Sequence, residues 1–268
     1  MADAPVTALC PTYGRFESLR DAVACFLLQT YRPRRLLILN DAPVPLYPHG
    51  GSTIVRVPGA TVEVWNADSR YETLGHKRQA LLTAARSGLV AHWDDDDWYL
   101  PWHLSQCVDA LQDGEADCVQ PGGAWWCTGR RDSFKVKGPR HNVFEGQMAF
   151  DRRVAIDLGG YSPKDSGQAR DLMERFKEHN SFRKWEPEKL SYCYRWGDGW
   201  THISAAKSGA KFADGNANFG GSNPLIPDSA DPVSWAMDRM RPIWGLLLRR
   251  LPDETARCRM EANLTGYL

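Results

Sequence analysis

Apolar residues in the first half of the chain fall into short continuous runs and helically spaced sets that follow one another. The runs at 6–10, 36–39 and 89–93 predict buried β-strands. Apolar residues spaced three and four apart predict helices over 16–29, 74–85 and 102–111. Helices placed between buried strands are typical of βαβ units. The pattern therefore predicts an α/β fold with a Rossmann-like, mostly parallel central sheet.

The second half is more mixed. Short strands are predicted over 117–120, 122–126, 133–137, 143–150 and 190–196, and a two-stranded ribbon over 53–57 and 62–65 in the first half. Helices are predicted over 151–158, 168–179 and 235–250, the last interrupted at Pro242. A Gly-, Ala-, Asn- and Ser-rich segment at 204–223 predicts a mobile loop. We expect one domain over 1–225, with halves 1–115 and 116–225, and a helical extension over 226–268.

Composition narrows the function classes only a little. The formal net charge is zero, so no global basic field favours nucleic acid or an anionic membrane, although a local patch is compatible with it. Seven scattered cysteines without a CxxC pair fit a reducing compartment. The sequence shows neither a secretion signal nor a run of about 18 apolar residues, so we expect a cytoplasmic protein. Arg249 and Arg250 beside an apolar helix leave peripheral membrane contact open.

Four consecutive carboxylates follow the strand predicted at 89–93. Asp94, Asp95, Asp96 and Asp97 repel one another at neutral pH, and tryptophans bracket them. Mg²⁺ or Mn²⁺ would neutralise such a cluster and keep coordination positions for the phosphates of a ligand. A calcium-binding turn, or a merely solvated one, is the alternative interpretation.

Polar residues also follow or face the other predicted strands. Asp41 ends the second strand, where it could accept hydrogen bonds from a nucleotide base or ribose, or simply cap a turn. Lys77 and Arg78 lie at the start of a helix, where cations are unfavourable for the helix dipole but could receive a phosphate. A solvated basic turn is the alternative for this pair.

Four motifs follow one another along the chain: VTALCPTYGR at 6–15, LND at 39–41, GHKR at 75–78 with AHWDDDDWYLP at 91–101, and the segment 144–158 followed by GGY at 159–161. Taken together and in this order, they resemble family 2 glycosyltransferases of the GT-A fold. The resemblance covers about residues 5–200. It implies a GT-A (nucleotide-diphospho-sugar transferase) fold with a nucleotide-sugar-binding half at 1–115 and an acceptor-binding half at 116–225.

The resemblance also implies roles for individual residues. Mn²⁺ or Mg²⁺ would bind Asp96, with Asp94 and His202 as further candidate ligands. Four aspartates in a row leave the register open by one residue, so Asp95 and Asp97 stay candidates. The residues expected at the nucleotide-sugar are Pro11, Thr12, Tyr13, Arg15, Asp41, Lys77, Arg78, Asp94 and Asp95.

The catalytic base has a weaker match. The family usually has a Glu-Asp pair at the start of a helix after the Gly-Gly-Tyr turn, and here that stretch reads QARD at 168–171. Asp171 is the nearest match, with Asp165 and Glu174 as further candidates. A single displacement by an acceptor hydroxyl, with one aspartate as base, would invert the anomeric centre. Tryptophans expected either at the acceptor or in the core are Trp125, Trp126 and Trp200.

The partners follow from the same resemblance. We expect a nucleotide-diphosphate sugar donor, preferably a UDP-sugar, and a glycan, a lipid-linked sugar or another hydroxyl compound as acceptor. Nucleic acid enters only as an acceptor, for instance through a hydroxylated base in viral DNA. Basic residues at 130–140 would suit a polyanion, but a merely solvated face is the favoured interpretation of this stretch. The alternatives are a sugar nucleotidyltransferase, whose Gly-rich basic loop is missing, and a non-catalytic carbohydrate- or calcium-binding module.

Overall fold

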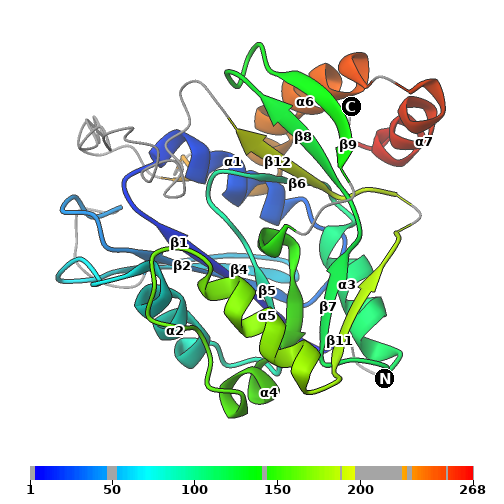
Figure 1. Ribbon diagram of the computed structural model, residues 1–268. Coiled ribbons are helices and arrows are strands. Elements are labelled where there is room, and N and C mark those ends of the chain that lie inside the picture. Colours follow the sequence, from blue (N-terminus) through cyan, green and yellow to red (C-terminus); the bar gives the residue numbers. More distant parts are fainter. Residues whose placement is uncertain are drawn as a thin grey trace.

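The computed structural model describes residues 4–46, 53–140, 144–187, 189–196, 225–227, 231–251 and 253–267. An eight-stranded mixed sheet forms its centre, in the order β11-β7-β10-β5-β1-β2-β4-β3 (Figure 1). β1, β2, β4 and β5 run parallel, whereas β3 and β10 are antiparallel to their neighbours. The strands are β1 (Val6–Thr12), β2 (Arg34–Asn40), β3 (Thr53–Val57), β4 (Ala60–Asn66), β5 (Leu89–His92), β7 (Cys118–Pro121), β10 (Ala149–Asp151) and β11 (Phe182–Trp185).

A second, smaller sheet lies beyond the carboxyl end of β5. Its strands are β6 (Trp98–Tyr99), β8 (Ala124–Thr128), β9 (Lys135–Arg140) and β12 (Tyr192–Trp196). They lie in the order β6-β12-β8-β9, so β9 is an edge strand. β12 runs parallel to β8, and β9 pairs with β8 as an antiparallel hairpin.

Helices and the smaller sheet bury both faces of the central sheet (Figure 1). One core contains side chains of α1 (Phe16–Leu27), α3 (His103–Gln112), α6 (Pro232–Arg250) and α7 (Glu254–Leu264) together with residues of both sheets. The other core contains side chains of α2 (Leu74–Ala84), α4 (Arg152–Asp157) and α5 (Gln168–Glu178). The predicted α/β architecture is thus confirmed. The C-terminal helices share a core with α1 instead of forming a separate one.

Two predicted elements differ from the structure. Within the segment predicted as a strand at 143–150, the described residues form a 3₁₀ turn (η1, Glu145–Gln147) before β10. The backbone at Gly146 passes so close to the site that an added β-carbon would lie 2.6 Å from Oδ2 of Asp94. The helix predicted to be interrupted at Pro242 continues through that residue as α6, and Pro242 lies on its exposed side.

Within the described residues, none of the helices has both the length and the apolar character needed to span a membrane. The parallel strands β1, β2 and β5 all end at one edge of the central sheet. In open α/β sheets ligands bind beyond such carboxyl ends. The four aspartates leave β5 at this edge and lead into β6 of the smaller sheet.

Candidate active site

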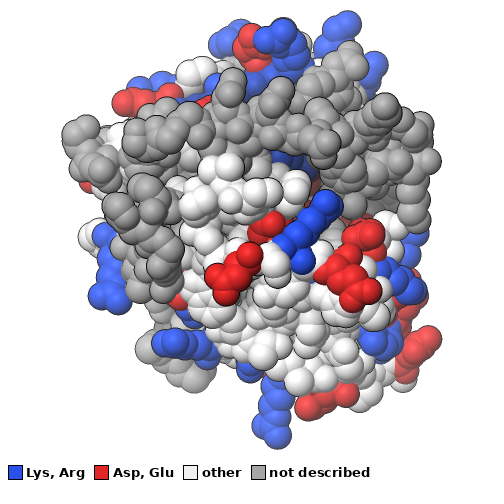
Figure 2. Space-filling view, turned by 90° about the vertical axis from the view of Figure 1, so that its left-hand side faces the viewer, with Lys and Arg blue, Asp and Glu red and all other residues white. Residues whose placement is uncertain are grey.

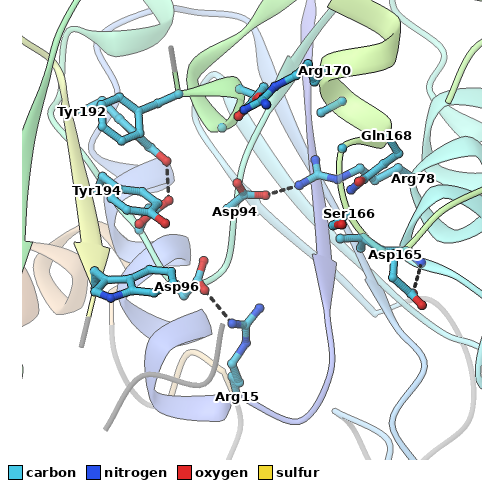
Figure 3. A pocket seen from close by; sticks show the side chains of 18 of the residues that line it. Arg15, Arg78, Asp94, Asp96, Asp165, Ser166, Gln168, Arg170, Tyr192 and Tyr194 are labelled. Atoms are coloured by element: carbon cyan, nitrogen blue, oxygen red, sulfur yellow. Dashed lines mark hydrogen bonds and ion pairs between the residues drawn. The ribbon is translucent and has the colours of Figure 1, made fainter. Parts of the chain in front are cut away.

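A cavity of about 640 Å³ lies beyond β5, between the aspartate segment, the turn before α5 and the small sheet (Figure 3). Figure 3 shows Tyr192 and Tyr194 on one side of it, Arg78 and Asp165 on the other, and Asp94 between them. The lining comprises Arg15, Leu74, Arg78, Asp94, Asp96, Asp97, Trp126, Phe144, Glu145, Gly146, Asp165, Ser166, Gly167, Gln168, Ala169, Arg170, Tyr192, Tyr194 and Trp196.

Asp97 is held by the small sheet. Its Oδ1 accepts a hydrogen bond from the backbone N–H of Arg195 at 2.8 Å, and its Oδ2 accepts one from the Tyr192 hydroxyl. The residue is 1% exposed. Because both carboxylate oxygens are engaged in joining the acidic segment to β12, Asp97 is poorly suited to bind a metal ion.

Asp95 faces inwards, towards the end of β1. Its Oδ2 accepts hydrogen bonds from Thr12 Oγ1 at 2.6 Å and from Arg15 Nε at 3.2 Å, and Oδ1 pairs with the same guanidinium group. Burial raises the pKa of the Asp95 carboxyl, and the Arg15 charge works against that rise. Asp95 is not among the residues that line the cavity, so its contacts place it as the support of Arg15.

Asp94 and Asp96 project into the cavity (Figure 3). Asp94 pairs with Arg78, and Asp96 Oδ2 accepts a hydrogen bond from Arg15 Nη1 at 2.6 Å. Two guanidinium groups therefore face three carboxylates, those of Asp94, Asp95 and Asp96. Asp95 lies behind the cavity wall, so a cation in the cavity would meet the carboxylate oxygens of Asp94 and Asp96.

Lys77 and Asp41 form a buried pair beside the cavity. Lys77 Nζ pairs with the Asp41 carboxylate and donates to the Thr12 carbonyl at 2.7 Å. Burial lowers the pKa of Lys77, whereas the Asp41 charge raises it. Asp41 Oδ2 also accepts the backbone N–H of Tyr71 at 3.0 Å. Lys77 thus ties the ends of β1 and β2 together, and the ring of Tyr13 lies 5.9 Å from its ammonium group.

The two predicted base residues differ in position. Asp165 lines the cavity and accepts a hydrogen bond from the backbone N–H of Leu74 at 3.2 Å. Asp171 does not line it and instead accepts a hydrogen bond from Lys164 at 2.7 Å. Hydrogen bonds from Lys164 and Ser162 lower the pKa of Asp171, which makes it a weaker base.

The tryptophan predictions also separate. Trp126 lines the cavity, whereas Trp125 points to the other side of β8 and is 4% exposed within the core. Trp125 therefore belongs to the core, the second of its two predicted positions. Trp200 and His202 lie outside the described residues.

The carboxylates at the cavity fit a Mg²⁺ or Mn²⁺ ion that is shared with a diphosphate. In the part of the chain that the structure describes, no group of three or more His, Cys, Asp or Glu residues could hold a metal alone. Mg²⁺ usually binds one or two carboxylates together with substrate phosphates, and not an all-protein cage. Asp96 and Asp94 would supply such a partial ligand set.

Sequence reasoning missed several residues of the cavity. Glu145 and Arg170 form an ion pair at 2.9 Å on its rim, and Gln168 and Ala169 occupy the start of α5. The rings of β12, in contrast, had a signal in the period-two aromatic pattern at 190–196. The ion pair had none, because its partners come from η1 and α5 and meet only in the folded chain.

Solved structures share this arrangement of elements. TarS from S. aureus (residues 1–349), in complex with UDP-GlcNAc, aligns with a TM-score of 0.58 at 12% identity, covering 98% of this chain and 72% of that one. The mannosyltransferase PcManGT from Pyrobaculum calidifontis, in complex with GDP-Man and Mn²⁺, aligns with a TM-score of 0.52 at 16% identity, covering 97% and 75%. At such identities the likeness shows the fold, that of GT-A glycosyltransferases.

No curated protein sequence matches the chain significantly. The family model described as "Glycosyl transferase family 2" matches residues 7–176, which include nearly all of β1, the acidic segment and nearly all of α5. This match favours a glycosyltransferase over a nucleotidyltransferase or a binding module. The chain belongs to family 2 of the glycosyltransferases.

Proposed function

We propose that this glycosyltransferase is metal-dependent, takes its sugar from a nucleoside diphosphate donor and transfers it with inversion to an acceptor hydroxyl. One observation carries the proposal: Asp94 and Asp96, each paired with an arginine, line the same cavity as Asp165. A UDP-sugar is the first donor to test, since S. aureus TarS is described with UDP-GlcNAc and with UDP.

The donor half of the cavity would hold the nucleotide. The Asp41–Lys77 pair, beside Thr12 and Tyr13, lies at the ends of β1 and β2, where a base and ribose would bind. Arg15 and Arg78 would face the diphosphate from the cavity wall. Asp96, with Asp94, would hold Mn²⁺ or Mg²⁺. When bound, this ion supplies Lewis-acid stabilisation of the departing diphosphate.

The chain's own residues would perform the remaining steps. Asp165 would accept the proton of the acceptor hydroxyl while the oxygen of that hydroxyl forms a bond to the anomeric carbon. The bond between that carbon and the β-phosphate oxygen breaks, and the nucleoside diphosphate leaves with the electron pair. Arg15 and Arg78 would stabilise the leaving group electrostatically. One displacement on the face opposite the leaving group inverts the anomeric centre.

Titration calorimetry with UDP and Mn²⁺ tests the donor site. The Asp96→Asn variant should lose the metal-dependent part of the binding, because a neutral amide is a poor ligand for a hard cation. The matched control is Asp109→Asn, which changes an exposed aspartate on α3. Equal metal-dependent affinity in wild type and Asp96→Asn would overturn the proposed site.

A further inference from the structure

One face of the small sheet carries aromatic and basic residues side by side. Paired residues on neighbouring strands share a face. Tyr194 pairs with Trp126, Trp196 pairs with Thr128, and Thr128 pairs with Lys135. These five side chains therefore lie on the same face, which reaches the cavity through Tyr194, Trp126 and Trp196.

A β-bulge extends this face along β9. The register moves from Cys127↔Val136 to Trp125↔Pro139, so Trp126 opposes two residues, Lys137 and Gly138. Gly138 takes up the extra position with a φ of +93°. After the bulge Arg140, and not Pro139, returns to the face of Lys135 and Lys137. Its guanidinium carbon lies 4.1 Å from the centroid of the Trp126 ring, as this register requires.

The opposite face of the small sheet is buried. Cys127 and Val136 pack into the core that contains Trp244 of α6. In contrast Lys135, Lys137 and Arg140 are exposed. Within the described residues none of the three is paired with a carboxylate. Figure 2 shows Lys and Arg side chains, together with some Asp and Glu, at the top of the view, the end that β8, β9 and α6 occupy in Figure 1.

The rings on this face are suited to stacking. The Tyr194 and Trp196 rings are nearly parallel, at 23° with centroids 6.2 Å apart, and Trp126 meets Tyr194 edge-on at 5.4 Å. All three are half-buried. Alternate β9 residues such as Lys135 and Lys137 lie about 6.6 Å apart along the strand. A row of cations beside ring faces is how single-stranded nucleic acids are bound, with phosphates on the cations and bases on the rings.

We propose that the acceptor of this glycosyltransferase is a single-stranded nucleic acid that lies along β9 and stacks on Trp126, Tyr194 and Trp196. The inference rests on the proposed function for the reaction itself. A neutral glycan could use the rings but would leave Lys135 and Lys137 unused. An anionic polymer without rings could use the cations alone, and it is the competing outcome of the test.

The test measures binding by fluorescence anisotropy over a range of salt concentrations. The probes are a labelled oligothymidylate of about 15 nucleotides, long enough for this kind of groove, and polyphosphate of similar charge as an unlabelled competitor. Lys135→Gln/Lys137→Gln removes two cations of the face. Its matched control, Arg56→Gln/Lys184→Gln, removes two exposed cations from the edge strands β3 and β11 of the central sheet.

Lys135→Gln/Lys137→Gln should make the negative slope of log K against log salt shallower by about 1.4, because each lost phosphate contact contributes about 0.7. The control should keep the wild-type slope. Trp126→Leu should weaken oligothymidylate binding about 10-fold and leave the affinity for polyphosphate unchanged.

The nucleic-acid assignment would be overturned if polyphosphate competed as well as unlabelled oligothymidylate does. It would also be overturned if the control double variant lost as much affinity as the β9 double variant. Absence of oligothymidylate binding to the wild-type protein would also overturn it. Calorimetry with UDP and Mn²⁺ on the same preparations keeps the two proposals apart. Retained donor binding with no nucleic-acid binding refutes only the acceptor, whereas loss of donor binding in the wild type refutes the proposed function.

Discussion

The four consecutive aspartates are chemically equal in the sequence but have different surroundings in the fold. Asp97 is bound by Tyr192 and the Arg195 backbone, and Asp95 by Thr12 and Arg15. Asp94 and Asp96 line the cavity. Asp97 also borders the cavity, but both of its carboxylate oxygens already accept hydrogen bonds, so Asp94 and Asp96 stay the predicted metal ligands.

The same comparison separates the two candidate bases. Asp165→Asn should lower kcat by about 10²- to 10⁴-fold, the usual contribution of a general base, and should preserve donor affinity. Asp171→Asn removes a carboxylate already paired with Lys164 and should keep most of the turnover. Single-turnover transfer assays, with UDP binding measured alongside, distinguish the two. Wild-type turnover in Asp165→Asn would assign the base to another residue.

The buried His103 predicts how the stability of the folded protein depends on pH. Burial lowers its pKa to about 3, and it also lowers the pKa of His92. The folded protein keeps both rings neutral, whereas the unfolded chain binds their protons below about pH 6.5, so stability falls as the pH falls through that value. Each ring should contribute a loss of about 1.4 kcal/mol between about pH 7.5 and 5.5.

Urea unfolding of wild type and His103→Gln at both pH values measures that contribution. The variant cannot take up the proton in either state. Its loss of unfolding free energy between the two pH values should therefore be smaller than that of wild type by about 1.4 kcal/mol. An identical pH dependence in the two proteins would refute the assignment of a buried neutral His103.

At the scale of elements, prediction succeeded where the chain has a continuous apolar run or a regular helical spacing of apolar residues. The runs at 36–39 and 89–93 lie within or overlap β2 and β5, and the helical spacing from residue 16 predicted α1. β6 was missed because two residues are too few to show a period, and its pairing with β12 is long-range. The Asp165 contact was likewise invisible, since the backbone of Leu74 reaches it only when α2 meets the turn before α5.

A substitution at Gly75 tests the contact between α2 and the turn before α5. An added β-carbon would lie 1.9 Å from the Ser162 carbonyl oxygen and 2.9 Å from the Lys164 nitrogen. Gly75→Ala should therefore push α2 away from the turn, cost about 1–3 kcal/mol of stability and displace Asp165. Transfer should fall more than UDP binding does. Gly88→Ala, with open space around its β-carbon, is the control, and matching behaviour of the two variants in unfolding and transfer would contradict this account.

At the scale of the whole molecule, helix α6 is joined to the site through a buried carboxylate. Asp21 of α1 is fully buried and pairs with Arg239 of α6 at 2.7 Å and with Arg131 of the β8–β9 connection at 2.9 Å. Arg195 of β12 approaches it at 3.5 Å and also donates a hydrogen bond to the backbone carbonyl of Asp96. One side chain thus links α6, the small sheet and the acidic segment.

Asp21→Asn should destabilise the protein and weaken donor binding together. The amide leaves three guanidinium groups around Asp21 without their shared carboxylate, and breaking a buried pair costs about 3–5 kcal/mol. Arg195 then loses the group that orients it under Asp96. Glu17→Gln is the matched control, because Glu17 also lies on α1 and pairs with Arg239 but is largely exposed, and such pairs contribute about 0–1 kcal/mol. Thermal unfolding and UDP–Mn²⁺ calorimetry should place Glu17→Gln near wild type. Intact donor affinity in a destabilised Asp21→Asn would show that the link supports the fold without positioning Asp96.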